Sequence, residues 1–426
     1  MRARIGVTVL AASLAAAGCS IYTPDLLRAQ ASDDPEPVDA GADGIATDSS
    51  VGHDAGADAA HDAGPTDGGI NPTASDAHLD GDVVDSGPLV CAAHTAHCST
   101  SPAGACDVHT DTDPGNCGAC GHSCLGGACN AGQCAPVALV SGQTGAAYLV
   151  TDAAHVYWTN QTAGTVMQAN LDGSAMITLA TGQTTPFMIA SNATTVFWTN
   201  TTTPAGAVGS VPIGGGAVVY VATAQDAPRG LALGDTHVYW LNTGTVNGDL
   251  DRANFDGSNR ERLADPVAGG GGKDMAVFAD FVYWANGNDG TIRRAPTIGG
   301  TVDSIVVGQI KPQAVAVDAT GLYFTNYAVA GGGGNVVQLP AGGGEPSVIA
   351  ADQPGARRIA LDKDFVYWTN ELDGTVRKAP IVAPAMGARP VTTVAQAQGA
   401  PFGIAVDDKA IYWTNNSGGQ VMKVAK

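Results

Sequence analysis

Positively charged residues are scarce in this chain. Its 426 residues include 20 lysines and arginines against 40 aspartates and glutamates, and no stretch gathers the basic residues into a run. Nucleic acids are bound mainly through clustered lysine and arginine, so no nucleic-acid partner is expected. The acidic excess is local, because residues 31–90 hold 14 acidic residues and no basic one, whereas residues 136–426 hold 22 acidic and 17 basic residues.

The N-terminal region lacks an apolar run long enough to cross a membrane as a permanent helix. The run from Ile5 to Ala17 follows two arginines and is too short for that purpose, so residues 1–19 are predicted to be an export signal. Residues 16–19 (Ala-Ala-Gly-Cys) resemble a bacterial lipobox, in which Cys19 receives the lipid. The usual leucine three positions before the cysteine is absent. An ordinary cleaved signal peptide is the alternative.

The lipobox resemblance carries an expectation for localisation. Ser20 follows Cys19, where lipoproteins retained at the inner membrane often have aspartate. The resemblance therefore implies an outer-membrane lipoprotein of the cell envelope that contacts the membrane through its lipid anchor only. A periplasmic or secreted protein is the alternative. Residues 20–90, rich in Asp, Ala, Gly and Pro, are predicted to be a disordered linker because they cannot bury enough apolar surface to fold.

Cysteine is confined to the N-terminal third, and eight of the nine cysteines fall within residues 91–135: Cys91, Cys98, Cys106, Cys117, Cys120, Cys124, Cys129 and Cys134. In a short exported segment this predicts a module held by four disulfides, in any of 105 pairings. Zinc binding by Cys117, Cys120, His122 and Cys124 is the alternative, which an oxidising compartment disfavours. Residues 116–134 resemble the plant stigma-specific cysteine-rich family, which implies a scaffold and leaves its activity open.

Residues 136–426 contain no cysteine but seven copies of one phrase. VYWTN, VFWTN, VYWLN, VYWAN, LYFTN, VYWTN and IYWTN begin at residues 156, 196, 238, 282, 322, 366 and 411. A period of 40 to 45 residues, with four short strand-like runs and glycine turns per unit, predicts an all-β, seven-bladed β-propeller. Six blades are the alternative. The seventh unit lacks a fourth strand, and residues 136–143 read like one, so an N-terminal strand should close the ring.

These phrases, together with LDRANFDGSNRERL at residues 250–263, resemble the YWTD propellers of the low-density lipoprotein receptor family. The resemblance implies a propeller fold and carries no ligand across. Two features depart from that family. Asparagine stands in every copy where the family has aspartate, and the receptor propellers have six blades.

Motifs for catalysis are missing. The chain contains neither GxSxG nor HExxH, and only His155 and His237 fall within residues 136–426, each directly before a repeat phrase, where a turn is expected. The glycine runs at 269–272 and 331–334 have no Lys-Ser/Thr step for a phosphate loop. We therefore expect no enzyme, no cofactor and no metal.

One repeat position carries an unusual charge. Nine residues before each phrase, where the first strand of each unit begins at the mouth of the channel, stand Ala147, Phe187, Arg229, Lys273, Gln313, Arg357 and Phe402. Arg358 and Lys311 lie beside this ring, and Asp274 partly compensates it. Cations gathered around a narrow opening favour an anionic ligand. Alternatively, these long side chains extend into solvent without a role.

The sequence thus favours a non-enzymatic, envelope-anchored binding protein, in which a protein or an anionic ligand meets a propeller face. We expect it to be a monomer. The alternatives are a channel-centred lyase or hydrolase resembling the antibiotic-lactone lyases, which needs a histidine or carboxylate pair in the channel, and a structural scaffold of the envelope.

Overall fold

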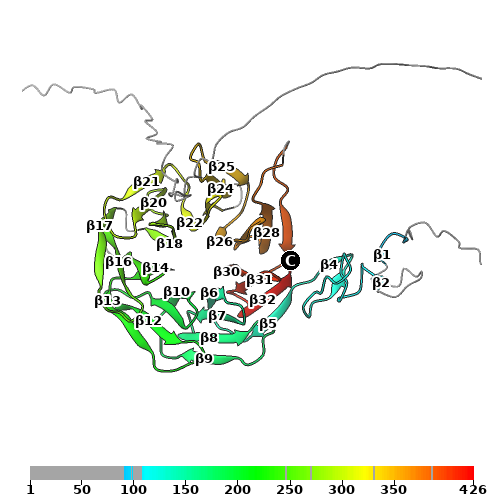
Figure 1. The fold of residues 1–426 in the computed structure, drawn as a ribbon, viewed down its shortest axis with the longest axis horizontal. Coiled ribbons are helices and arrows are strands. Elements are labelled where there is room, and N and C mark those ends of the chain that lie inside the picture. Colours follow the sequence, from blue (N-terminus) through cyan, green and yellow to red (C-terminus); the bar gives the residue numbers. More distant parts are fainter. Residues whose placement is uncertain are drawn as a thin grey trace, which may run out of the picture. The chain divides into compact units, whose positions relative to one another are not determined.

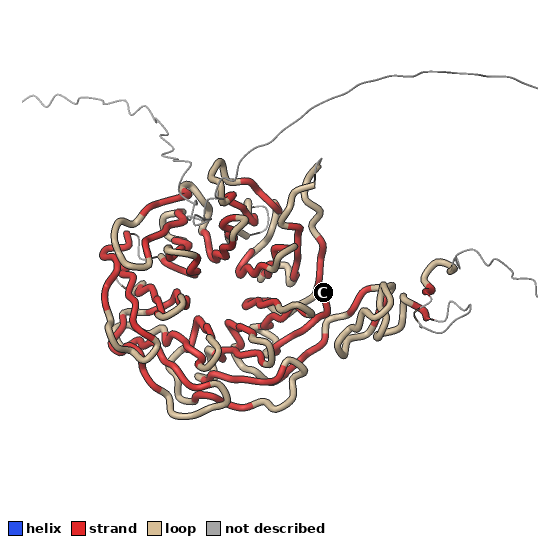
Figure 2. The backbone as a smooth tube through the Cα atoms, in the orientation of Figure 1, coloured by secondary structure: helices blue, strands red, loops and turns tan. Residues whose placement is uncertain are grey.

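A computed structural model describes residues 91–96, 98, 108–244, 247–268, 271–329, 332–384 and 387–426. Figure 2 shows them as strands and loops, and none of these residues forms a helix that could cross a membrane. Cys19, Cys106 and the predicted signal and linker lie outside the described residues.

Seven four-stranded antiparallel sheets stand around a central axis (Figure 1). The innermost strands are β6 (Ala146–Thr151), β10 (Pro186–Ser191), β14 (Pro228–Leu233), β18 (Gly272–Phe278), β22 (Pro312–Asp318), β26 (Ala356–Leu361) and β30 (Pro401–Val406). The second strands carry the repeat phrases: β7 (His155–Asn160), β11 (Thr195–Asn200), β15 (His237–Asn242), β19 (Phe281–Asn286), β23 (Gly321–Asn326), β27 (Phe365–Asn370) and β31 (Ala410–Asn415).

The third strands are β8 (Thr165–Asn170), β12 (Gly206–Pro212), β16 (Asn247–Asn254), β20 (Thr291–Pro296), β24 (Asn335–Pro340), β28 (Thr375–Pro380) and β32 (Gln420–Ala425). The outermost strands are β9 (Ile177–Ala180), β13 (Val219–Gln225), β17 (Glu261–Ala268), β21 (Asp303–Val306), β25 (Ser347–Ala350), β29 (Thr392–Ala395) and β5 (Val137–Ser141). We number the blades from β6–β9 (blade 1) to the sheet β30-β31-β32-β5 (blade 7).

The ring closes through the N-terminal strand of the propeller. β5 pairs with β32 at the C-terminus, with Val140 opposite Val421 and Val137 opposite Lys423. The predicted closing strand and the seven-bladed architecture are therefore confirmed, and the six-bladed alternative is wrong. Closure in this way covers the sheet edge that blade 7 would otherwise expose.

The second strands are buried on both faces because neighbouring blades pack against each other. Trp158 and Val156 of blade 1 pack in one cluster with Tyr412 of blade 7, while Tyr157 packs with Trp198 of blade 2. All six tryptophans of the repeat phrases are fully buried. Each large apolar side chain buried in this way contributes about 1.5–3 kcal/mol, so the blade interfaces supply most of the stability of a domain that has no disulfide.

A glutamine on the connection between consecutive blades holds the repeat phrase of the following blade. In blade 2, the Oε1 atom of Gln183 accepts hydrogen bonds from Trp198 Nε1 and Asn200 Nδ2, both at 2.9 Å. Gln183 Nε2 in turn donates to the carbonyl of Thr181 at 2.9 Å. We call this arrangement the glutamine clamp. It recurs with Gln143, Gln183, Gln225, Gln353 and Gln398.

In six blades the clamp uses the asparagine that ends the repeat phrase as a hydrogen-bond donor. An asparagine amide donates to the glutamine carbonyl, whereas an ionised aspartate would place a second acceptor against it. Blade 5 has phenylalanine in place of tryptophan, and there Gln309 accepts only from Asn326, at 2.8 Å. In blade 4 the corresponding position is Gly269, which lies outside the described residues.

The cysteine-rich segment contains the strand pairs β1 (Thr95–Ala96) with β2 (Val108–His109) and β3 (Cys129–Asn130) with β4 (Gln133–Cys134). Its disulfides join Cys98 to Cys120, Cys117 to Cys129 and Cys124 to Cys134, and Cys91 is also disulfide-bonded. The predicted use of the cysteines in disulfides is thus confirmed for these seven.

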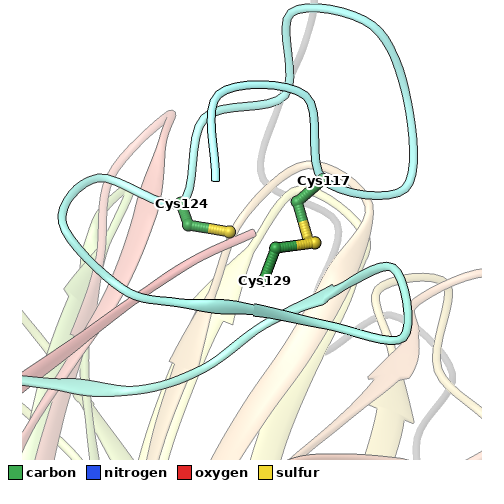
Figure 3. Close-up of side chains that lie close together, drawn as sticks. All are labelled: Cys117, Cys124 and Cys129. Atoms are coloured by element: carbon green, nitrogen blue, oxygen red, sulfur yellow. A yellow bond between two sulfur atoms is a disulfide. The ribbon is translucent and has the colours of Figure 1, made fainter. Parts of the chain in front are cut away.

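Three cysteine sulfurs in this segment lie close enough together to suggest a metal site. The sulfurs of Cys117, Cys124 and Cys129 lie within 4.8 Å of one another (Figure 3). Because each is part of a disulfide, none can supply the thiolate that zinc requires. His122, the other candidate ligand, points its ring nitrogens at the carbonyl oxygens of Cys117 and Lys426. The residues proposed as zinc ligands are therefore engaged in disulfides or hydrogen bonds.

The glutamine clamp predicts a graded effect of Gln→Ala substitutions. Gln183→Ala leaves two buried donors, on Trp198 and Asn200, without an acceptor, at about 1–3 kcal/mol each. We expect it to lower the free energy of unfolding in urea by about 2–4 kcal/mol. Gln309→Ala is the matched control, because it deprives only Asn326 and should cost less than half as much. Equal losses in the two variants would contradict the clamp.

Candidate ligand-binding cavity at the channel mouth

The predicted ring of residues lies at one level of the channel. Each of its members is the second residue of an innermost strand, on the face where the repeat phrases end. Here the structure encloses a cavity of about 290 Å³. It is lined by Tyr148, Phe187, Arg229, Lys273, Lys311, Gln313, Tyr327, Arg357 and Arg358. The structure therefore brings together all five cationic residues that the sequence singled out.

Aromatic rings support the arginines of this cavity. The guanidinium carbon of Arg229 lies 5.3 Å from the ring centre of Phe187, and that of Arg357 lies 4.2 Å from the ring centre of Phe402. Tyr148 contacts both phenylalanines, with ring centres 4.5 and 5.1 Å away. Stacking of this kind restricts the plane of a guanidinium group and leaves its N–H edges free for hydrogen bonds.

A buried ion pair spans the channel beneath the cavity. Arg358 of blade 6 contacts the carboxylate of Asp274 in blade 4, and their side chains are 17% and 4% exposed. The guanidinium also lies 4.7 Å from the ring centre of Tyr148 in blade 1 and 3.3 Å from the sulfur of Met188 in blade 2. Side chains from four blades thus meet across the axis and form the floor of the cavity.

The two charged groups of the floor, the carboxylate of Asp274 and the guanidinium of Arg358, are each other's ion-pair partners. Burial raises the pKa of Asp274, while Arg358 and the backbone amides of Val315 and Met275 oppose that rise. Burial acts to lower the pKa of Arg358, but the charge of Asp274, the neighbouring Tyr148 and the hydrogen bond to Asp274 together raise it. Burial also raises the pKa of Tyr148.

The remaining cations are only partly neutralised. Arg357 pairs with Glu371 at 3.2 Å. Within the part of the chain that the structure describes, Arg229, Lys273 and Lys311 have no carboxylate at ion-pair distance. The pKa of Lys273 is lowered, first by burial and then by the charges of Arg229 and Arg357. The cavity therefore holds an excess of positive charge at short range.

Sequence reasoning missed Tyr148, Tyr327 and Glu371. Tyr148 is in register with Asp274 and Arg358, one position after the ring. Tyr327 and Glu371 each follow the asparagine that ends a repeat phrase, which places them beside the mouth. Burial raises the pKa of Tyr327, as do the charge of Glu371 and a hydrogen bond to it. These repeat registers were visible in the sequence and could have identified all three residues.

The two histidines of the propeller lie away from the cavity. His155 and His237 are the first residues of β7 and β15, at the ends of those strands away from the mouth. No histidine is among the described residues that line the cavity, and its two nearby carboxylates, Asp274 and Glu371, are both tied to arginines. The described lining thus carries five cationic side chains, of which two are paired with carboxylates.

Comparisons with known proteins identify the fold alone. No protein-family model and no curated protein matches the chain. Similar solved structures include virginiamycin B lyase from Staphylococcus aureus (14% identity, TM-score 0.57, covering 68% of this chain and 98% of that one). A catalytically inactive histidine-to-alanine variant of the same lyase, solved with quinupristin, is similar to the same extent (15%, 0.56, 68% and 98%). Hydrazine synthase from Kuenenia stuttgartiensis is another (13%, 0.57, 66% and 96%).

The floor of the cavity predicts a strong dependence of stability on Asp274. Asp274→Ala leaves the charge of Arg358 buried without its partner, and breaking a buried pair in this way costs about 3–5 kcal/mol. We expect a loss of that size in urea unfolding. Asp364→Ala, which removes an exposed ion pair with Lys363, is the control and should change stability little. Similar losses in both variants would show that Arg358 does not depend on Asp274.

Proposed function

We propose that this chain is a non-enzymatic binding protein of the cell envelope whose propeller takes up an anionic ligand at the channel mouth. The observation that carries the proposal is the convergence of Arg229, Lys273 and Lys311, from three different blades or their connections, on one cavity without a carboxylate partner among the described residues. Like charges held together repel one another, so their proximity is unfavourable until an anion neutralises them.

The site also has the form of a binding site. It is concave, it combines a few charged groups with aromatic surfaces, and it stands on the ends of rigid strands. Its arginines are already stacked on Phe187 and Phe402. Binding of a ligand therefore costs little conformational entropy of these side chains.

We place the propeller in the cell envelope. Cys19 is the lipid attachment point, residues 20–90 are the spacer, and the disulfide module precedes the propeller. An anchor at the outer membrane is favoured by Ser20. The exported context agrees with the disulfides of the module, because disulfides persist in oxidising compartments. The protein acts as a monomer, since the binding site is complete within one chain.

A lyase is the second candidate, because the fold is similar to that of virginiamycin B lyase. The inactive form of that enzyme is a histidine-to-alanine variant. The cavity described above has no histidine among its lining residues, which is why binding is preferred. A purely structural envelope protein would not need uncompensated cations in a cavity.

We expect small organic anions to stabilise the protein, and we expect this stabilisation to require the cationic side chains at the channel mouth. At about ten times Kd a ligand adds about 1.4 kcal/mol, which corresponds to a rise in Tm of about 3–5 °C. The double variant Arg229→Ala/Lys273→Ala should lose this shift. Lys363→Ala, which removes an exposed cation outside the cavity, should keep it. If no anion raises the Tm of the unmodified protein, or if quinupristin is consumed in its presence, the proposal is wrong.

The envelope assignment predicts that Cys19 carries a lipid. Bacteria that express the full chain and are fed labelled palmitate should incorporate the label into the protein, and Cys19→Ala should abolish incorporation and shift the protein from the membrane to the soluble fraction. Membrane association that survives Cys19→Ala would contradict a lipid anchor.

A further inference from the structure

The charge balance of the cavity limits what the ligand can be. Of its five cations, Arg357 and Arg358 have their own carboxylates in Glu371 and Asp274. Arg229, Lys273 and Lys311 remain, and they bring three positive charges. A ligand with one negative charge would leave two of them uncompensated, and the charged form of Lys273 is already disfavoured by burial and then by the charges of Arg229 and Arg357. A ligand with two negative charges leaves one positive charge uncompensated, and a ligand with three compensates them all.

The size of the cavity limits the ligand as well. A volume of about 290 Å³ equals the share of about ten water molecules in the liquid. Beneath it, Arg358, Asp274, Tyr148 and Met188 close the channel. The ligand therefore enters from one face and cannot thread through the ring. An extended polymer is excluded from the cavity, and a molecule of about ten to fifteen non-hydrogen atoms fits.

The geometry of the cations adds a third limit. Arg229 is stacked on Phe187 and is held from blade 3, Lys273 comes from blade 4, and Lys311 stands at the exposed rim before blade 5. Three cations on consecutive blades can contact separate oxygens of one ligand. Arginine offers a planar pair of N–H donors to a carboxylate or phosphate, and lysine acts as a point charge.

We propose that the ligand of the channel mouth is a compact oxyanion with two or three negative charges, such as a small polycarboxylate or a phosphate ester, held jointly by Arg229, Lys273 and Lys311. This inference rests on the proposed function, since it names the class of anion that the same cavity selects. Phe187 is a positioning residue, because it holds the guanidinium of Arg229 without contributing charge.

A matched series of anions tests the number of charges. Propane-1,2,3-tricarboxylate, glutarate and butyrate share a three-carbon core with three, two and one carboxylates, and inorganic phosphate at pH 8 serves as the phosphate probe. Binding to the full chain is measured by calorimetry at fixed ionic strength. We expect glutarate, the tricarboxylate or phosphate to bind at least tenfold more tightly than butyrate. Preference for the carboxylates or for phosphate then distinguishes the two chemistries.

Variants test which residues make the affinity depend on the number of negative charges on the ligand. Arg229→Gln, Lys273→Met and Lys311→Met each remove one charge, and each should reduce the ratio of tricarboxylate to butyrate affinity at least fivefold. Phe187→Leu should weaken the tricarboxylate severalfold but leave the salt dependence of its binding unchanged, because no charge is lost. A purely structural Phe187 would lower the Tm without this change in affinity. Lys363→Ala is the control and should bind as the unmodified protein does.

The outcomes separate this inference from the proposed function. Butyrate binding as tightly as the tricarboxylate, with both lost in Arg229→Gln, would overturn the multivalent ligand while the anion site stands. Binding of no anion would overturn both. Multivalent binding that is unaffected by all three charge variants would place the site elsewhere and also overturn both.

Discussion

The packing of each blade against the next is the interaction on which the rest of this structure depends. Every repeat phrase presents an apolar residue and an aromatic ring to one neighbour and a tyrosine or phenylalanine to the other, so no blade buries its surface alone. The glutamine clamp fixes the orientation of the packed side chains, because the tryptophan indole and the asparagine amide of one phrase donate to the same glutamine oxygen. The result is a ring whose innermost strands begin at one common level, and the cavity lies at that level.

The repetition made most of the fold predictable. The spacing of the phrases indicated seven blades, and the missing fourth strand of the last unit indicated closure by residues 136–143, within which β5 (Val137–Ser141) pairs with β32. The clamp was not predicted, because Gln183 stands 15 residues before Trp198 and on a connection where glutamine has no propensity signal. Only the folded ring brings that connection against the indole. Asparagine ends every phrase, and in six blades its amide donates to the glutamine of the clamp.

The sequence was enough to predict which residues lie at the channel mouth, but not the directions and partners of their side chains. Equal register places Arg229, Lys273 and Arg357 at the mouth, since equivalent residues of a propeller occupy equivalent positions. Register does not tell where a long side chain goes. Arg358 turns under the cavity to reach Asp274 on a blade two positions away, and Arg357 turns to Glu371. These directions depend on the radius of the ring and on which neighbours carry small residues, so three-dimensional packing decides which cations remain available.

The account as a whole depends on the claim that the channel mouth holds an anion of multiple charge. The most direct measurement is a crystal structure of the protein soaked in tungstate, a dianion whose metal gives an anomalous signal. The account predicts an anomalous peak inside the cavity, with its oxygens within hydrogen-bond distance of Arg229 and Lys273. Anomalous peaks at other surfaces with none at the mouth would contradict it.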